Sequence, residues 1–96
     1  MGFKFYIMSD KILCFYHHNL VLVPFEDAES GYYPVYEKAE IIKEDVPINN
    51  RDYGILIDGD GFNLVESTWD GFQPVYDLDV FEIMKIMSEI MGMVGA

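Results

Sequence analysis

The stretch from Ile55 to Thr68, ILIDGDGFNLVEST, constrains the fold more than any other part of the chain. Two apolar, β-prone runs flank two successive Asp-Gly pairs in it. Asp and Gly accept the positive φ angles that a tight turn between antiparallel strands requires, and the isoleucine, leucine and valine residues on either side favour strands. The stretch therefore predicts a β-hairpin.

A calcium-binding loop is the alternative interpretation of the same aspartates. Asp58 and Asp60 match the first and third ligand positions of an EF-hand loop. Phe62 and Asn63, however, take the places of a further oxygen ligand and of the glycine that bends the loop. Trp69 takes the place of the closing glutamate. The pattern thus favours the hairpin.

Other β-prone runs surround this hairpin. The runs 12–16 and 20–25 are separated by His17-His18-Asn19, which predicts a first hairpin with the histidines in its turn. Further strands are expected over residues 3–8 and 32–42.

The C-terminal segment has a different periodicity. Asp77 or Asp79 is suited to cap a helix that follows. From there on, apolar residues recur every three or four positions, which is typical of one helix face: Val80, Ile83, Met87, Ile90 and Val94. Five more apolar residues lie outside this seam: Phe81, Met84, Ile86, Met91 and Met93.

This apolar helix surface is wider than a single contact with a sheet requires. Two interpretations remain open, burial in the chain's own core and a homodimer interface. In the second interpretation the interface comprises Val80, Ile83, Met84, Met87, Ile90 and Met91.

These elements predict an α+β fold in a single domain over residues 1–96. We expect an antiparallel sheet of about five or six strands, arranged as hairpins, with one C-terminal α-helix packed on it. A homodimer is the expected assembly.

Two segments of the chain resemble each other. Residues 31–37 (GYYPVYE) and 71–77 (GFQPVYD) share glycine, proline, valine and tyrosine at matching positions. We interpret the match as an internal repeat of residues 11–50 and 51–90. Each half would then be a hairpin, an acidic loop and a Pro-Val-Tyr segment.

Acidic residues accompany both copies of the repeat, and Glu26 aligns with Glu66. Carboxylates are rarely buried, so we expect them at the surface, whereas Tyr36 and Tyr76 are expected to cap the core in two similar corners. The predicted partner-binding face comprises Glu26, Asp27, Glu29, Glu37, Asp58, Asp60, Glu66, Asp70 and Asp77.

The overall charge agrees with such a face. The chain has 17 acidic and 6 basic residues, a net charge of -11 and a pI near 4.2. Because 51% of its residues are hydrophobic, it is expected to fold rather than remain disordered. A surface this acidic repels nucleic acid and anionic membranes and attracts cationic partners, so we expect neither direct nucleic-acid binding nor membrane binding.

Cysteine content and hydropathy predict the compartment. Cys14 is the one cysteine, which excludes an internal disulfide and fits a reducing environment. The apolar run after Lys4 ends at residues 9–11, too early for an export signal. No apolar run reaches the roughly 18 residues of a membrane helix. We therefore expect a cytoplasmic protein.

Catalytic and metal-binding patterns are missing from the sequence. His17 and His18 have no serine or cysteine in a known catalytic context, and no phosphate-binding glycine motif occurs. Cys14 and His18 would share one face of a strand, but a structural zinc site needs four ligands. We expect a protein that is not an enzyme and that needs no metal and no cofactor.

In size, acidity and lack of catalytic motifs the chain resembles the phage-encoded DNA-mimic inhibitors, small proteins that block host nucleoid proteins, nucleases or transcription factors. The resemblance implies that carboxylates stand in for phosphates on a basic DNA-binding protein, such as a nucleoid-associated protein, in the host cell cytoplasm. It also implies a homodimer or a pseudo-symmetric surface.

Two other classes of function remain open. One is an adaptor or immunity-type protein that binds through aromatic and Met-rich surfaces. The other is a structural subunit whose apolar helix joins a larger assembly. Binding that weakens steeply with added salt would separate the electrostatic mimic from both.

Overall fold

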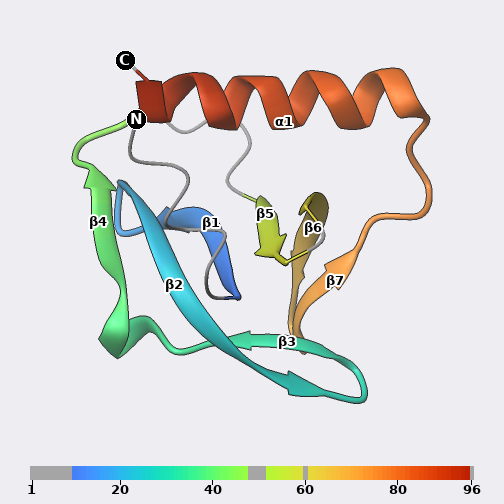
Figure 1. Ribbon diagram of the computed structural model, residues 1–96, viewed down its shortest axis with the longest axis horizontal. Coiled ribbons are helices and arrows are strands. Elements are labelled where there is room, and N and C mark those ends of the chain that lie inside the picture. Colours follow the sequence, from blue (N-terminus) through green and yellow to red (C-terminus); the bar gives the residue numbers. More distant parts are fainter. Residues whose placement is uncertain (1–9, 48–51, 60, 96) are drawn as a thin grey trace.

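The structure of the chain is a computed structural model that describes residues 10–47, 52–59 and 61–95. It confirms the α+β class, an antiparallel sheet with one C-terminal helix (Figure 1). The predicted strand over residues 3–8 lies outside the described residues. The elements are β1 (Lys11–Tyr16), β2 (Asn19–Ala28), β3 (Gly31–Pro34), the 3-10 helix η2 (Tyr36–Lys38), β4 (Glu40–Lys43), β5 (Tyr53–Asp58), β6 (Gly61–Thr68), β7 (Gly71–Pro74) and α1 (Val80–Gly95).

The sheet closes on itself. Its strands follow the order β1-β5-β6-β7-β3-β2-β4, and β1 also pairs with β2, so that six strands form a small barrel-like sheet. The remaining strand, β4, is added beside β2. Strand β2 makes this arrangement possible because it is 10 residues long: residues 19–24 pair with β1, and residues 25–28 pair with β3.

Two-residue turns join both predicted hairpins. Tyr16 pairs with Asn19, and the two histidines between them have φ angles of 50° and 66°. Positive φ at both central positions gives a turn whose twist matches that of the flanking strands. Asp58 pairs with Gly61 in the second hairpin, which confirms the hairpin interpretation of the Asp-Gly pairs. Asp60 lies outside the described residues.

The strand predicted over residues 32–42 is wrong as a continuous element. It divides into β3, η2 and β4. Pro34 ends β3 because proline has no N–H to donate to a ladder. The chain then bends through η2, and β4 returns to pair with the first half of β2, where Val21 lies opposite Ile41.

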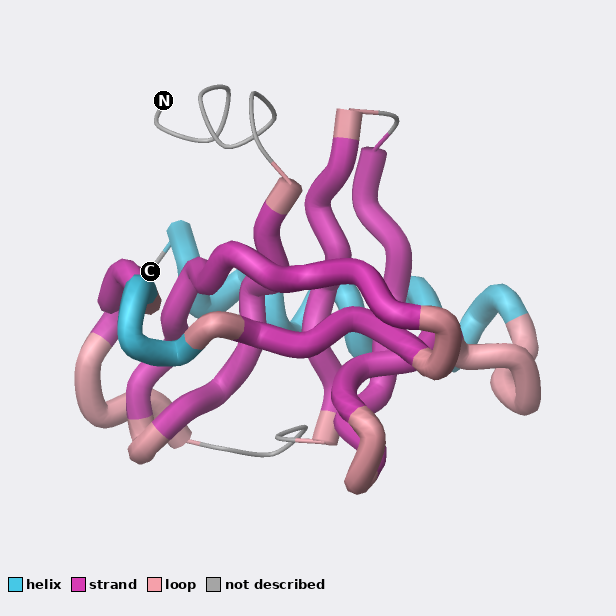
Figure 2. Tube along the Cα trace, turned by 90° about the horizontal axis from the view of Figure 1, so that it is seen from below, coloured by secondary structure: helices cyan, strands magenta, loops and turns pink. Residues whose placement is uncertain are grey.

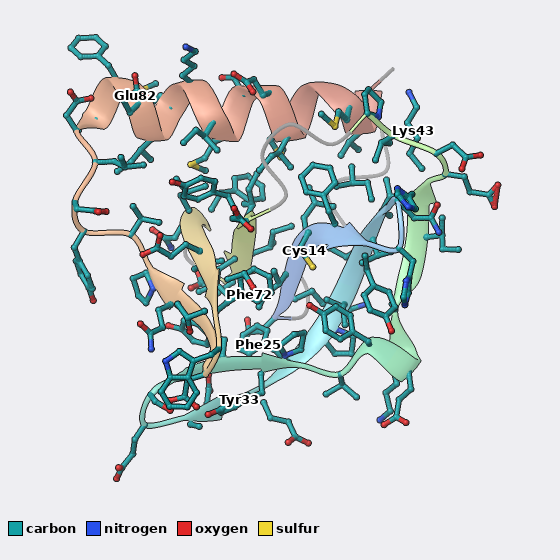
Figure 3. The ribbon with its side chains drawn as sticks, turned by 180° about the vertical axis from the view of Figure 1, so that it is seen from behind. Cys14, Phe25, Tyr33, Lys43, Phe72 and Glu82 are labelled. Carbon is teal, nitrogen blue, oxygen red and sulfur yellow. The ribbon has the colours of Figure 1, made fainter. Side chains whose placement is uncertain are left out.

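Apolar side chains are buried on both faces of the sheet. One cluster lies between the sheet and α1 and includes Leu13, Leu22, Ile57 and Ile90. The other lies on the opposite face, inside the closed sheet, and includes Cys14, Val23, Val65 and Phe72. Figure 2 shows the helix on the far side of the strands, and Figure 3 shows Cys14 and Phe72 within the sheet. Because successive residues of a strand point to opposite faces, burial on both sides explains continuous apolar runs such as ILCF in β1.

Helix α1 begins as predicted at an aspartate cap. The Oδ1 atom of Asp79 accepts a hydrogen bond of 2.9 Å from the backbone N–H of Glu82. The helix contacts β5 and β4, and Ile86, which the predicted seam leaves out, is buried against the sheet. Val80, which the seam includes, is 66% exposed. The reason is that the first turn of α1 extends beyond the strands that it covers (Figure 1).

The strands of the two halves meet at matching positions. Tyr32 of β3 pairs with Phe72 of β7, its counterpart in the second segment of the repeat. Strands β1 and β5, which also correspond in the repeat, pair with each other in the same antiparallel sense. An antiparallel pair centred on equivalent residues has an approximate two-fold axis between them, so β1–β3 and β5–β7 are related in this way. The division into repeats 11–50 and 51–90 stays a prediction, since the parts that follow β3 and β7 differ.

Candidate partner-binding surface

Side chains of four consecutive strands, β2, β3, β7 and β6, point to the outside of the closed sheet. Glu26 of β2 lies opposite Tyr33 of β3, and Glu66 of β6 lies opposite Gln73 of β7. Phe72 is 3% exposed and points inward, so its strand neighbour Gln73 points outward, as does Tyr33 (Figure 3). We call Glu26, Tyr33, Gln73 and Glu66 the outer face. The two glutamates lie three strands apart along this curved sheet.

Reciprocal hydrogen bonds join the turns at the edge of this face. The Tyr33 hydroxyl donates to Asp70 in the β6–β7 turn, and Gln73 Nε2 donates to the backbone carbonyl of Ser30 in the β2–β3 turn at 2.6 Å. Tyr33 and Gln73 occupy equivalent positions in the two segments of the repeat, as do Ser30 and Asp70 just before them. The two bonds therefore follow the same approximate two-fold relation as the strands.

The contacts of Asp70 favour its ionised form. Hydrogen bonds from Ser30 and then Tyr33 hold the pKa of this carboxyl below its ordinary value. The Oγ of Ser30 also lies 3.1 Å from the Tyr33 hydroxyl. The backbone N–H of Asp70 donates to Oγ1 of Thr68 at 3.1 Å, which holds the turn. Asp70 thus presents a negative charge with a fixed orientation.

The repeated glycines let the two turns approach. A Cβ atom at Gly31 would lie 2.5 Å from the backbone oxygen of Phe72, and one at Gly71 would lie 2.8 Å from that of Tyr32. Contacts this short with backbone atoms exclude a side chain. The recurrence of glycine at the start of both segments therefore reflects the close β3–β7 contact.

The structure brings some of the predicted acidic residues together and separates others. Glu26, Glu66 and Asp70 belong to the outer face and its edge. Asp27 and Glu29 are exposed at the end of β2 and in the turn that follows. The others lie on separate elements: Glu37 on η2, Asp58 at the end of β5 and Asp77 before α1. Asp60 lies outside the described residues.

Basic residues are missing from the strands that carry the outer face. No Lys or Arg occurs in residues 12–37 or 52–84. The described basic residues lie elsewhere, with Lys11 at the start of β1, Lys38 on η2, Lys43 at the end of β4 and Lys85 on α1. The carboxylates of the outer face therefore have no basic neighbour on their own strands.

A shallow groove lies beside the β2–β3 turn. It has a volume of about 570 Å³ and is lined by Asp27, Glu29, Tyr32, Gln73 and Tyr76, among others. The ring of Tyr76 is 86% exposed, so the expectation that Tyr76 caps the core is wrong. Residue 76 follows the end of β7, where no strand covers it, whereas its counterpart Tyr36 is half buried.

Tyr36 packs at the inner cluster. Its ring stacks on that of Tyr16 with centroids 4.1 Å apart, and its hydroxyl hydrogen-bonds to the sulfur of Cys14. Burial raises the pKa of the Cys14 thiol from 9.0 to about 12, and it raises the pKa of Tyr36 from 10.0 to about 12. The cysteine is therefore a protonated, buried side chain at neutral pH. In the described residues, no group of three or more His, Cys, Asp or Glu side chains is placed to hold a metal ion.

The predicted dimer-interface residues divide between core and surface. Ile90 is fully buried in the chain's own core, so it has no surface left for a second copy, and its assignment to an interface is wrong. Ile83, Met87 and Met91 are partly buried and pack against the same cluster. Val80 and Met84 are exposed, at 66% and 61%.

The three most exposed aromatic side chains of the described residues are absent from the predicted site. Trp69 is 96% exposed at the tip of the β6–β7 turn, and Phe81 is 84% exposed beside Met84 on α1. Tyr76 is the third. The position of Trp69 between Thr68 and Asp70, in a turn-prone stretch, is a sequence signal of exposure.

No known protein family, curated protein or solved structure matches this chain. In the described part of the chain, no helix has the length and apolar character needed to cross a membrane.

Proposed function

We propose that this chain is an acidic DNA mimic, which binds the nucleic-acid-binding surface of a basic protein and thereby inhibits it. The observation that carries the proposal is the outer face. Glu26 and Glu66 flank it, Asp70 is held ionised at its edge, and its strands have no Lys or Arg. Carboxylates in fixed positions accept charge-assisted hydrogen bonds from lysine and arginine side chains as phosphates do.

The approximate two-fold relation of the outer face supports a symmetric partner. Glu26 and Glu66 lie on opposite sides of the Tyr32–Phe72 pair, through which the approximate axis passes. Many DNA-binding proteins are two-fold symmetric dimers. One chain would then bind one dimeric partner, with each glutamate facing one subunit. Where it binds, DNA is displaced.

The experiment is capture from a cell lysate on the immobilised protein at low salt, followed by elution with a salt gradient and by competition with DNA. We expect one abundant basic DNA-binding protein, eluted by moderate salt and displaced by added DNA, because screening weakens exposed charge pairs. The Glu26→Lys, Glu66→Lys double variant should no longer capture this DNA-binding protein.

The matched control carries the same charge change elsewhere. Glu40 on β4 and Glu82 on α1 are exposed acids outside the outer face. Glu40→Lys, Glu82→Lys should retain most of the capture. A partner that holds through high salt, that DNA does not displace, or that both double variants release equally would contradict the proposal.

A second candidate function is an adaptor that binds through apolar contacts. It is favoured by the exposed Phe81, Val80 and Met84 on the first turns of α1, since adjacent exposed apolar side chains mark interaction surfaces. Under this function, Phe81→Ser, Met84→Ser should release a captured partner, while added salt should not.

A further inference from the structure

We propose that the groove beside the β2–β3 turn binds the guanidinium group of an arginine side chain on the partner protein. This inference rests on the proposed function and deepens it, because it names a contact that the basic partner makes. The groove adjoins the outer face and shares Gln73 with it, but its acids are different ones, Asp27 and Glu29.

The groove is large enough to admit a side chain. Its volume is about 570 Å³. Asp27 pairs with Tyr32 in the β2–β3 ladder, so both side chains lie on the same face of the sheet. Glu29 and Ala28 line the groove on the turn side, and Pro74 lines it from β7. The small side chain of Ala28 leaves room for a side chain that enters between them.

The charge of the groove specifies a cation. Asp27 and Glu29 both line it and are exposed, and no Lys or Arg occurs in residues 12–37, the stretch that contains them. A cationic donor fork in the groove therefore meets two carboxylates.

Aromatic rings favour arginine over lysine. The ring of Tyr76 lines the groove and is 86% exposed, so one of its faces is available for stacking. A planar guanidinium stacks on an aromatic face while its N–H groups bond to carboxylates, whereas a lysine ammonium is a compact and strongly hydrated point charge. Tyr32 provides a second ring in the same groove.

The corresponding place in the other half lacks these features, so the groove is not a simple consequence of the fold. When the two halves are aligned on their Pro-Val-Tyr segments, Ser67 stands in place of Asp27, and Trp69 in place of Glu29. Tyr36, the counterpart of Tyr76, stacks on Tyr16. The acids and the free ring occur together at one end of the molecule.

The test uses capped tripeptides with a central arginine, lysine or citrulline, added to the isotope-labelled protein at low salt and followed by NMR. Citrulline is a neutral isostere of arginine. We expect the arginine peptide to shift the backbone signals of Glu29, Gly31, Gln73 and Tyr76. The lysine peptide should bind more weakly, and citrulline should not bind.

Variants locate the contact. Asp27→Asn and Glu29→Gln should each weaken arginine binding by about two- to fivefold, as for exposed ion pairs. Tyr76→Leu should weaken it by about two- to fivefold through loss of stacking, and Tyr76→Phe should bind as the unaltered protein does. The control double variant Glu40→Gln, Glu82→Gln should bind the arginine peptide as tightly as the unaltered protein does. The spectra themselves show whether each variant is folded.

The outcomes separate this inference from the proposed function. Shifts elsewhere, equal binding of lysine or citrulline, or no loss in the Asp27 and Glu29 variants would overturn the arginine site, even if the outer face captures a DNA-binding protein. Arginine binding in the groove without capture of any DNA-binding protein would uphold the site and overturn the proposed function.

Discussion

Single residues at the inner cluster take their chemistry from burial. Cys14 lies on β1 and Tyr36 lies on η2, and several elements separate them along the chain. Their side chains nevertheless form a hydrogen bond inside the closed sheet. A thiolate or a phenolate there would lose its hydration, and for this reason both pKa values lie above their ordinary values, at about 12. Asp70, on the outer edge, has the opposite shift because Ser30 and Tyr33 hydrogen-bond to it.

The buried pair predicts a loss of stability in alkaline solution. In the unfolded chain the Cys14 thiol has a pKa of 9.0, so it loses its proton near pH 9. In the folded chain its pKa is about 12, so it keeps the proton up to about pH 12. The free energy of unfolding is therefore unaffected by this group below pH 9 and falls above it, by up to about 1.4 kcal/mol per pH unit. Urea unfolding at several pH values across this window measures the slope.

Cys14→Val is the matched variant because it keeps an apolar side chain of similar size. The free energy of unfolding of this variant should fall less steeply above pH 9. The titration of Tyr36 accounts for part of the pH dependence that remains. An identical slope in both proteins would show that the thiol does not stay protonated in the folded state.

Elements are positioned by a few local features and by one close contact between strands. The two histidines of the first turn have positive φ, and Asp79 caps α1, so these boundaries depend on nearby residues. The β3–β7 contact differs, because it joins parts of the chain that are far apart and depends on Gly31 and Gly71.

Gly31→Ala is predicted to destabilise the protein. The new Cβ would lie 2.5 Å from the Phe72 oxygen, a backbone atom within a strand that cannot shift alone. We expect a loss of roughly 2–3 kcal/mol in the free energy of unfolding, measured by urea denaturation. Gly59→Ala is the control, since nothing lies within 4 Å of its added Cβ, and its effect should stay within about 0.5 kcal/mol. Equal effects would contradict the close approach.

The whole molecule consists of a helix on one face of a closed sheet, with an apolar cluster on each side of the strands. Figure 3 shows the polar side of the helix at Glu82, away from the sheet. The net charge of -11 destabilises the compact state, because the acidic residues repel one another. The packing of α1 on the sheet contributes stability that offsets this repulsion.

Ile90→Ala tests how α1 is held. Ile90 is fully buried between helix and sheet, so its truncation leaves a cavity and should cost about 2–5 kcal/mol. Met84→Ala, on the exposed side of the same helix at 61%, should cost less than about 0.5 kcal/mol. Thermal or urea unfolding measures both. A large and concentration-dependent loss for Met84→Ala would instead place that side in a homodimer interface.

The candidate site could be predicted only in part from sequence. The alignment of the two halves pairs Glu26 with Glu66, and both residues lie on the outer face. It also predicted equivalent roles for Tyr36 and Tyr76, which is wrong, because Tyr36 packs on Tyr16 while the ring of Tyr76 is exposed. A repeat specifies matching positions, but each position meets different neighbours.

The sequence by itself determined the hairpins, their turns and the C-terminal helix. Each of these is encoded by residues a few positions apart, through turn residues, strand propensity and helical periodicity. Only the tertiary structure decided that residues 32–42 divide between two halves of β2, that Tyr32 meets Phe72, and that Ile90 is core while Met84 is surface. These outcomes depend on which distant segments share buried surface when the sheet closes, and local patterns do not record that choice.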